Sequence, residues 1–153
     1  MKISFKRLII SILIPLVLGG IVGFLTSGSD SYKEMIQPSF APPAILFPIV
    51  WTVLYILMGI SFYIISESNN TLKEDAKFSY YLQLGVNLLW SFFFFTFKWY
   101  LFSSIWIVLL IILVVNMIRK FVNISKLAGY LQIPYLLWLI FALVLNISIY
   151  ILN

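Results

Sequence analysis

The charged residues of this chain leave five long windows that contain none of them. The windows cover residues 8–29, 35–66, 78–97, 99–118 and 127–153. A bilayer core about 30 Å thick is crossed by a helix of about 20 apolar residues, so each window is long enough for one crossing. The pattern predicts an all-α membrane protein that folds as a single bundle of five transmembrane helices.

The same windows set the expected element boundaries within a single domain over 1–153. We expect helices at about 7–26, 44–66, 78–97, 101–120 and 128–150, and a lid loop over 27–43. Only Lys98 divides the third window from the fourth, and one helix across both would be about 60 Å long, so we expect a chain reversal near 98–104. The first window resembles a signal peptide, but its apolar run is too long and lacks a small-residue cleavage site, so we expect a retained helix.

Composition excludes several classes of protein. Hydrophobic residues make up 63% of the chain and charged residues only 10%, whereas soluble domains are about one quarter charged. This balance excludes an ordinary soluble enzyme, a disordered chain and a nucleic-acid-binding protein. The sequence has no cysteine and no histidine, so it offers no thiolate or imidazole ligand for a metal or haem iron. Because the windows also lack acids and bases, we predict no catalytic residue, metal or cofactor.

The basic residues predict the orientation of the bundle in the membrane. With the N-terminus inside, the inner segments hold Lys2, Lys6, Arg7, Lys73, Lys77, Arg119, Lys120 and Lys126. The outer segments hold only Lys33 and Lys98. Because lysine and arginine concentrate in cytoplasmic segments, we expect a multi-pass protein of the cell membrane with a cytoplasmic N-terminus and an external C-terminus.

The loop over 27–43 carries signals for local order. Ser31 and Glu34 have the spacing of a capping box, which predicts a single turn of helix. Pro42 and Pro43 are expected to open the next helix, where a missing N–H group costs little. A long ordered loop over the mouth of a bundle is typical of a lid, and the alternative is a solvated connector.

Polar and aromatic side chains form stripes on three predicted helices. The stripes are Trp51 and Tyr55; Gln83, Asn87 and Ser91 with Trp90 beside them; and Tyr135, Trp138, Ala142 and Asn146. Their spacing of three or four residues places each set on one helix face. Such residues commonly pack or hydrogen-bond between membrane helices, and they also suit a small-molecule pocket, which is apolar with a few polar anchors. Three stripes beneath one loop favour the pocket.

Two further patterns concern packing. Gly19 and Gly23 form a Gly-x-x-x-Gly pair, which serves either a dimer interface or close packing within one bundle. The sequence leaves both interpretations open. Phe92–Phe95 covers all sides of its predicted helix, so part of this run must face lipid or a partner subunit.

Three blocks of sequence carry a family resemblance. The first is Tyr32, Pro38-Ser39-Phe40-Ala41-Pro42-Pro43 and Trp51-Thr52-Val53-Leu54-Tyr55; the second is Asn87-Leu88-Leu89-Trp90 with Phe92–Phe94; the third is Leu131-Gln132-Ile133-Pro134-Tyr135-Leu136-Leu137-Trp138 with Phe141-Ala142 and Leu145-Asn146. Together they resemble the signature of the translocator-protein family (TspO/MBR), also called peripheral benzodiazepine receptors or tryptophan-rich sensory proteins. The blocks fall on the second, third and fifth predicted helices.

The resemblance implies a five-helix bundle, usually a homodimer, with a pocket beneath the first loop. The family binds porphyrins and other tetrapyrroles, and in animals cholesterol and synthetic isoquinoline or benzodiazepine-type drugs. Matching positions imply the pocket residues Trp51, Asn87, Trp90, Trp138, Ala142 and Asn146, and the lid residues Tyr32, Pro42 and Pro43. We add Ser91 to the candidate ligand-binding residues from its stripe.

The residues also shape the expected ligand. A porphyrin macrocycle could stack on Trp51 and Trp138, and its carboxylates could reach Lys33 or the positive end of the second predicted helix. Because no histidine or cysteine can ligate iron, we expect metal-free tetrapyrroles to bind at least as well as haem. A sterol motif needs a basic residue after Tyr150, where only Ile151-Leu152-Asn153 follows, so cholesterol recognition is not expected.

Three functions stay open from sequence alone. We favour a membrane receptor or sensor for tetrapyrroles. A transporter of porphyrins or other amphipathic molecules would need two alternating exits, and no inverted repeat or intramembrane charge supports one. The resemblance to bacterial family members also implies light-dependent porphyrin degradation with tryptophans as reactive partners, although Ser31 replaces a loop tryptophan frequent in the family.

Overall fold

The computed structural model describes residues 2–27 and 31–153, and for Ser31 the backbone only. Its elements are α1 (Phe5–Thr26), α2 (Ser31–Glu34), α3 (Leu46–Ser66), α4 (Lys73–Ser91), the π-helix η1 (Phe92–Thr96), α5 (Tyr100–Ile124), α6 (Lys126–Tyr130) and α7 (Ile133–Leu152). These residues contain no β-strand. The expected all-α architecture is therefore confirmed for the part of the chain that is described.

Four helical segments are long and apolar enough to cross a membrane, which makes this a multi-pass membrane protein. They are Phe5–Thr26, Leu46–Ser66, Tyr100–Ile124 and Lys126–Leu152, the last of which joins α6 to α7. Helix α4 is not among them, because its first turns carry four charged residues, Lys73, Glu74, Asp75 and Lys77. It begins five residues before the expected Phe78. The structure thus has more helices than the five expected, since α2, η1 and α6 are separate short elements.

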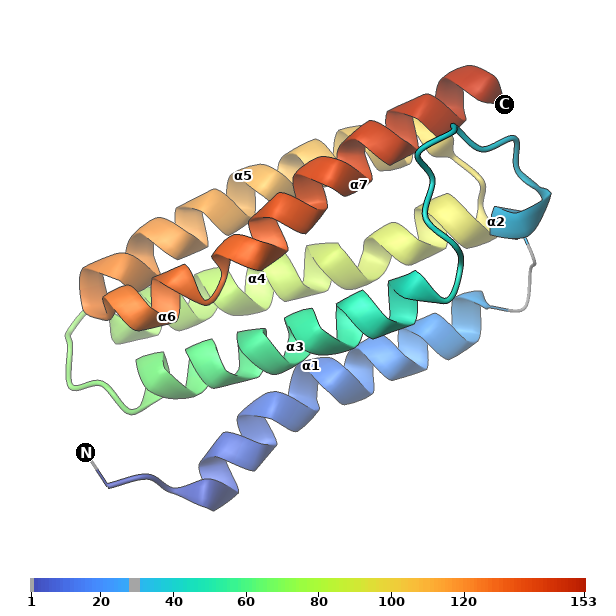
Figure 1. The fold of residues 1–153 in the computed structure, drawn as a ribbon. Helices are drawn as coiled ribbons and strands as arrows, with labels where there is room; N and C mark the ends of the chain where they lie inside the picture. The colour runs from blue at the N-terminus through green and yellow to red at the C-terminus, as the bar shows by residue number, and fades with distance from the viewer. Residues whose placement is uncertain (1, 28–30) are drawn as a thin grey trace.

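Neighbouring long helices pack side by side (Figure 1). Helix α1 packs along α3, α4 along α5, and α5 along α7. The short α6 contacts both α5 and α3, while α1 also contacts α4 and η1, and these contacts close the ring of helices. The expected reversal after the third window lies between η1 and α5.

Two glycines allow α1 and α3 to approach closely. A Cβ atom on Gly59 would collide with the α1 backbone, at 2.6 Å from the Ser11 carbonyl oxygen. A Cβ atom on Gly19 would collide with the Tyr55 ring, at 2.9 Å from its Cζ atom. A Cβ atom on Gly23 would have no neighbour within 4 Å. Gly19 therefore serves packing within the bundle, and Gly23 does not.

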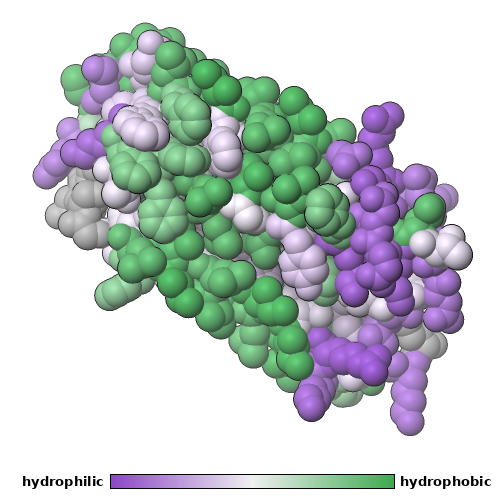
Figure 2. Space-filling model, turned by 180° about the vertical axis from the view of Figure 1, so that it is seen from behind, coloured by the Kyte–Doolittle hydropathy of each residue, from purple (hydrophilic) through white to green (hydrophobic). Residues whose placement is uncertain are grey.

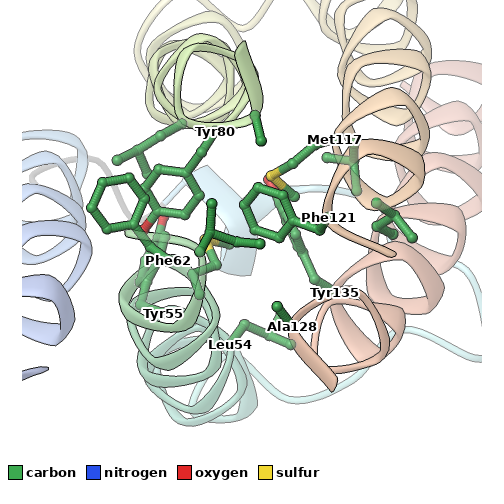
Figure 3. Packing of buried hydrophobic residues seen from close by; sticks show 14 of the residues in the cluster. Leu54, Tyr55, Phe62, Tyr80, Met117, Phe121, Ala128 and Tyr135 are labelled. Atoms are coloured by element: carbon green, nitrogen blue, oxygen red, sulfur yellow. The ribbon is translucent and has the colours of Figure 1, made fainter. Parts of the chain in front are cut away.

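A buried hydrophobic cluster with several aromatic rings joins α3, α4, α5, α6 and α7 (Figure 3). Phe62 of α3 lies 4.6 Å from the Tyr80 ring of α4, and Tyr80 stacks at 6.4 Å on Phe121 of α5. Ser61 also donates a hydrogen bond to the Ala128 carbonyl, which ties α3 to α6. These contacts hold the long helices together around one buried core.

The surface has the distribution expected in a bilayer. Figure 2 shows a broad apolar band with hydrophilic residues gathered toward the ends of the molecule. At the end that holds the start of α1, two ion pairs join neighbouring segments, Arg7 with Glu67 at 3.2 Å and Lys120 with Asp75 at 3.0 Å, and a third, Lys77 with Glu74 at 3.8 Å, lies within α4. Large apolar side chains outside the core, such as Ile112 and Leu137, are exposed on the band. Exposed apolar side chains of this kind suit contact with the acyl chains of a membrane.

The turn between η1 and α5 contains backbone strain at Lys98, whose φ of 56° lies in the left-handed region. Glycine adopts this conformation freely, whereas a side chain with a Cβ atom is penalised by about 1–2 kcal/mol. We therefore expect Lys98→Gly to raise the free energy of unfolding by about 1 kcal/mol. Thermal unfolding in detergent measures this, and Lys98→Ala, which keeps the Cβ atom, is the matched control. Equal stability of the two variants would contradict the argument.

Candidate ligand-binding cavity

A cavity of about 520 Å³ lies beneath α2, between α1, α3, α4 and η1. Its lining residues are Leu16, Gly19, Gly20, Val22, Gly23, Thr26, Ser27, Tyr32, Lys33, Ala44, Phe47, Pro48, Trp51, Thr52, Tyr55, Asn87, Trp90, Ser91 and Phe95. Small-molecule sites typically measure about 300–1,000 Å³ and combine an apolar wall with a few polar groups. This cavity has both the size and the lining of such a site.

An aromatic partition forms one wall of the cavity. It consists of Tyr32, Phe47, Trp51, Trp90 and Phe95, which also line a second cavity of only about 20 Å³. That small cavity lies toward α7, where Trp138, Ala142, Leu145 and Asn146, together with Phe94 of η1, complete its lining. The side chains of α7 are thus separated from the large cavity by a layer of aromatic rings.

The rings of the partition contact one another and those of neighbouring helices. Trp51 stacks on Tyr55 at 5.5 Å with an interplanar angle of 29°, and its edge meets Tyr135 of α7 at 6.2 Å. Phe47 meets Trp138 at 5.9 Å in a T-shaped arrangement. Offset stacking and edge-to-face contacts are the favoured geometries of aromatic pairs. Trp51 therefore has a fixed place in the wall of the cavity.

The polar end of the cavity is Asn87, which joins three helices. Its Oδ1 atom accepts a hydrogen bond from the Tyr55 hydroxyl at 2.8 Å, and its Nδ2 atom donates to the Tyr135 hydroxyl at 2.8 Å. Tyr135 in turn donates to Oε1 of Gln83 at 2.8 Å. Gln83 and Asn87 of the α4 stripe thus form hydrogen bonds to neighbouring helices. Of the stripe, only the part from Asn87 to Ser91 lines the cavity.

Asn146 of α7 is engaged at every position of its amide. Its Oδ1 atom accepts from Trp90 Nε1 at 3.0 Å and from the Ser103 hydroxyl at 3.1 Å. Its Nδ2 atom donates to the Tyr100 carbonyl and to the Ser104 hydroxyl, both at 2.9 Å. An amide has two acceptor sites and two N–H groups, so Asn146 retains no free hydrogen-bonding group for a ligand.

The loop after α1 packs as an ordered lid. Tyr32 and Met35 are buried, and the Tyr32 hydroxyl donates to the Pro42 carbonyl at 2.7 Å. Gln37 Nε2 donates to the Tyr32 carbonyl at 2.5 Å, and Phe47 meets the Tyr32 ring at 5.0 Å. Burial raises the pKa of the Tyr32 hydroxyl, so this hydroxyl stays protonated as a donor at neutral pH. These contacts favour a lid over a solvated connector.

Two expectations about the lid concern its prolines and the capping role of Ser31. Pro42 and Pro43 were expected to open the second long helix, but α3 begins only at Leu46, after a turn in which the Leu46 amide donates to the Pro43 carbonyl at 3.0 Å. The expectation was wrong because a turn intervenes between these prolines and the helix. The capping contact of the Ser31 side chain lies outside the described residues.

The expected site residues divide into three groups. Tyr32, Trp51, Asn87, Trp90 and Ser91 line the large cavity, Trp138, Ala142 and Asn146 line only the small one, and Pro42 and Pro43 line neither. Phe47 and Phe95 also line the large cavity, although neither was expected there from the sequence. Phe47 could have been found, because it lies four residues before Trp51 on the same helix face. Phe95 could not, because its direction depends on the π-helical turn η1.

Charge within the site is limited to the lid. Lys33 is the one ionisable cation among the lining residues and lies exposed beside the cavity. It forms no ion pair with another described residue. Within residues 2–27 and 31–153 no group of three acidic, histidine or cysteine side chains could hold a metal ion. Chemically, the cavity offers aromatic and aliphatic surface to an apolar body, and Lys33 is the one cation among its lining residues.

The fold and the cavity define a multi-pass helical membrane protein with an aromatic site beneath its first loop. The sequence model of the TspO/MBR family matches residues 11–152, and the chain belongs to this family. It is 39% identical to the tryptophan-rich protein TspO of Archaeoglobus fulgidus, over 98% of this chain and 99% of the relative.

Two further relatives cover most of the chain. The tryptophan-rich protein TspO of Chlorobaculum tepidum is 38% identical, over 80% of this chain and 78% of the relative. The tryptophan-rich sensory protein of Cereibacter sphaeroides is 29% identical, over 81% and 77%. The resemblance found in the sequence blocks is therefore confirmed.

Proposed function

We propose that this protein is a membrane receptor or sensor that binds tetrapyrroles of the protoporphyrin type in the cavity beneath α2. The observation that carries the proposal is the 520 Å³ cavity with Trp51 and Trp90 in its wall. Indole rings offer large flat surfaces for stacking on a planar macrocycle. One relative is named a tryptophan-rich sensory protein, which agrees with a sensory role. Synthetic isoquinoline or benzodiazepine-type ligands have the same flat apolar character.

The proposal includes a placement in the membrane. Helix α4 continues into η1, so the helical segment over 73–96 is about 36 Å long at 1.5 Å per residue, enough for a fifth crossing. Its charged first turns lie beside the ends of neighbouring helices, since Asp75 pairs with Lys120 of α5. We place this basic end, and with it the N-terminus, on the cytoplasmic side, because lysine and arginine concentrate there. The lid then faces the external side.

The direct test is titration of the purified protein with protoporphyrin, followed by quenching of tryptophan fluorescence. We expect Trp51→Leu to weaken binding about ten-fold, because it removes a stacking surface from the cavity wall. Trp99→Leu is the matched control, since Trp99 is exposed in the turn before α5 and does not line the cavity. If both variants bind with the affinity of the wild type, the cavity is not the porphyrin site.

A second titration tests the role of Lys33. We expect Lys33→Gln to weaken protoporphyrin binding about two- to five-fold, which is the usual value of a partly exposed ion pair. Lys98→Gln, on the same side but outside the cavity lining, should change nothing. Protoporphyrin dimethyl ester, which lacks the acids, should bind wild type and Lys33→Gln equally well. A loss of ester binding in Lys33→Gln would contradict the assignment of the carboxylate to Lys33.

A further inference from the structure

The side chain of Asn153 pairs with the backbone of the lid. Its Oδ1 atom accepts a hydrogen bond from the Ile36 amide at 3.1 Å, and its Nδ2 atom donates to the Ile36 carbonyl at 2.9 Å. The same Nδ2 atom donates to the Ile149 carbonyl of α7 at 2.8 Å. One amide therefore satisfies both backbone groups of Ile36 and is itself oriented by the last turn of α7.

Two apolar contacts lie on either side of this pairing. On one side the buried Met35 belongs to the same cluster as Ile149 of α7. On the other side Phe40 meets Phe141 of α7 edge to face at 6.3 Å. Figure 1 shows the loop before α3 passing beside the C-terminal end of α7. The lid is thus fastened to α7, which lies across the bundle from the α1 wall of the cavity.

The pairing at Ile36 is exposed, with 61% of that residue accessible. Water competes for exposed hydrogen bonds, so their net contribution is modest and they open readily. The contacts that Tyr32 makes with Pro42 and Gln37 lie within the lid and hold its internal shape. They do not anchor it to the bundle. Asn153 provides the hydrogen-bonded anchor to α7, between the apolar contacts of Met35 and Phe40.

We propose that Asn153 is a positioning residue that latches the lid to α7 and thereby sets how fast solutes in water reach the cavity. That the cavity binds a ligand rests on the proposed function, whereas the contact of Asn153 with the lid does not depend on it. When the amide of Asn153 is removed, Ile36 keeps no partner from α7, and the lid can lift by rotation of the segment on either side of it. Tyr32 and Lys33 of the same lid line the cavity.

The chain contains no cysteine, so a single introduced thiol can report access. Ser91→Cys places it on the cavity wall. Its rate of modification by a charged, membrane-impermeant methanethiosulfonate measures entry through the lid without any porphyrin. We expect Asn153→Ala to raise that rate about ten-fold. Asn153→Asp replaces the donor to the Ile36 and Ile149 carbonyls with a carboxylate oxygen that repels both, so it should raise the rate at least as much.

Asn116→Ala is the control, because Asn116 is an exposed amide on α5 that does not line the cavity. Hydrogen exchange over residues 35–40 provides a second readout, and we expect faster exchange of the Ile36 amide in Asn153→Ala. Unchanged thiol modification in Asn153→Ala would overturn the proposal, and so would faster exchange without faster modification. Failure of protoporphyrin to bind the wild type would overturn the proposed function alone, since neither readout uses that ligand.

Discussion

Replacing Gly59 with alanine should lower the free energy of unfolding by about 3 kcal/mol, the upper end of the usual cost of overpacking. The added Cβ atom would collide with the backbone of α1 at Ile12 and Ser11. A clash with backbone is relieved only by moving the whole helix, whereas a clash with a flexible side chain is relieved by rotation. Thermal unfolding in detergent or nanodiscs measures the loss.

Gly85→Ala provides the matched control for Gly59→Ala. Gly85 lies on α4, another long helix, and its Cβ position has no neighbour within 4 Å. There the substitution should stabilise by about 0.5–1 kcal/mol, the general cost of glycine in a helix. Opposite signs for the two variants would show that contact between α1 and α3 decides the outcome. A loss of similar size in both would instead indicate a general intolerance of larger residues, contrary to our argument.

The same contact connects stability to the site. Helix α1 contributes one wall of the cavity, through Leu16, Gly20 and Gly23 among others. Its position relative to α3 is set by the approach at Gly59 and by Gly19 against Tyr55. Protein that remains folded in Gly59→Ala should therefore bind protoporphyrin more weakly, although Gly59 does not line the cavity.

Much of the fold could be predicted because the membrane imposes a simple rule of length and charge. The windows around α1, α5 and α7 anticipate those helices, since their apolar residues face lipid as well as the core. The start of α4 was placed too late at Phe78, because four charged residues argue against a buried helix. In the structure these residues lie at the hydrophilic end of the bundle, and Asp75 finds a partner in Lys120. A window without charged residues marks the apolar middle of a membrane helix but not its solvent-exposed ends.

The candidate site was predicted in composition but not in arrangement. Spacing alone identified the faces that carry Trp51 and Asn87, and both line the cavity. Spacing could not show that aromatic rings separate α7 from that cavity, since this depends on how three helices lie against one another. Nor could it show that the amide of Asn153 reaches a loop more than one hundred residues earlier. Such long-range contacts have no periodic signal in the sequence.

Replacing Asn146 should cause a large loss of stability. We expect Asn146→Leu to lower the free energy of unfolding by about 2–3 kcal/mol, because four hydrogen bonds are lost and the Trp90 indole N–H is left without its acceptor. Asn116→Leu, on the exposed face of α5, should be nearly neutral. Thermal unfolding of both variants measures the difference.

Asn146 could contact the ligand or hold the bundle together, and the two roles predict opposite results in such an experiment. A residue that contacts ligand alone would lose affinity for protoporphyrin and keep its stability when replaced. A residue that holds the bundle together would lose stability, and would alter binding only through its neighbours. The structure favours the second role, because Asn146 holds Trp90, a member of the aromatic partition, by a 3.0 Å hydrogen bond. Wild-type stability of Asn146→Leu together with a loss of affinity would reverse this assignment and return Asn146 to direct contact with the ligand.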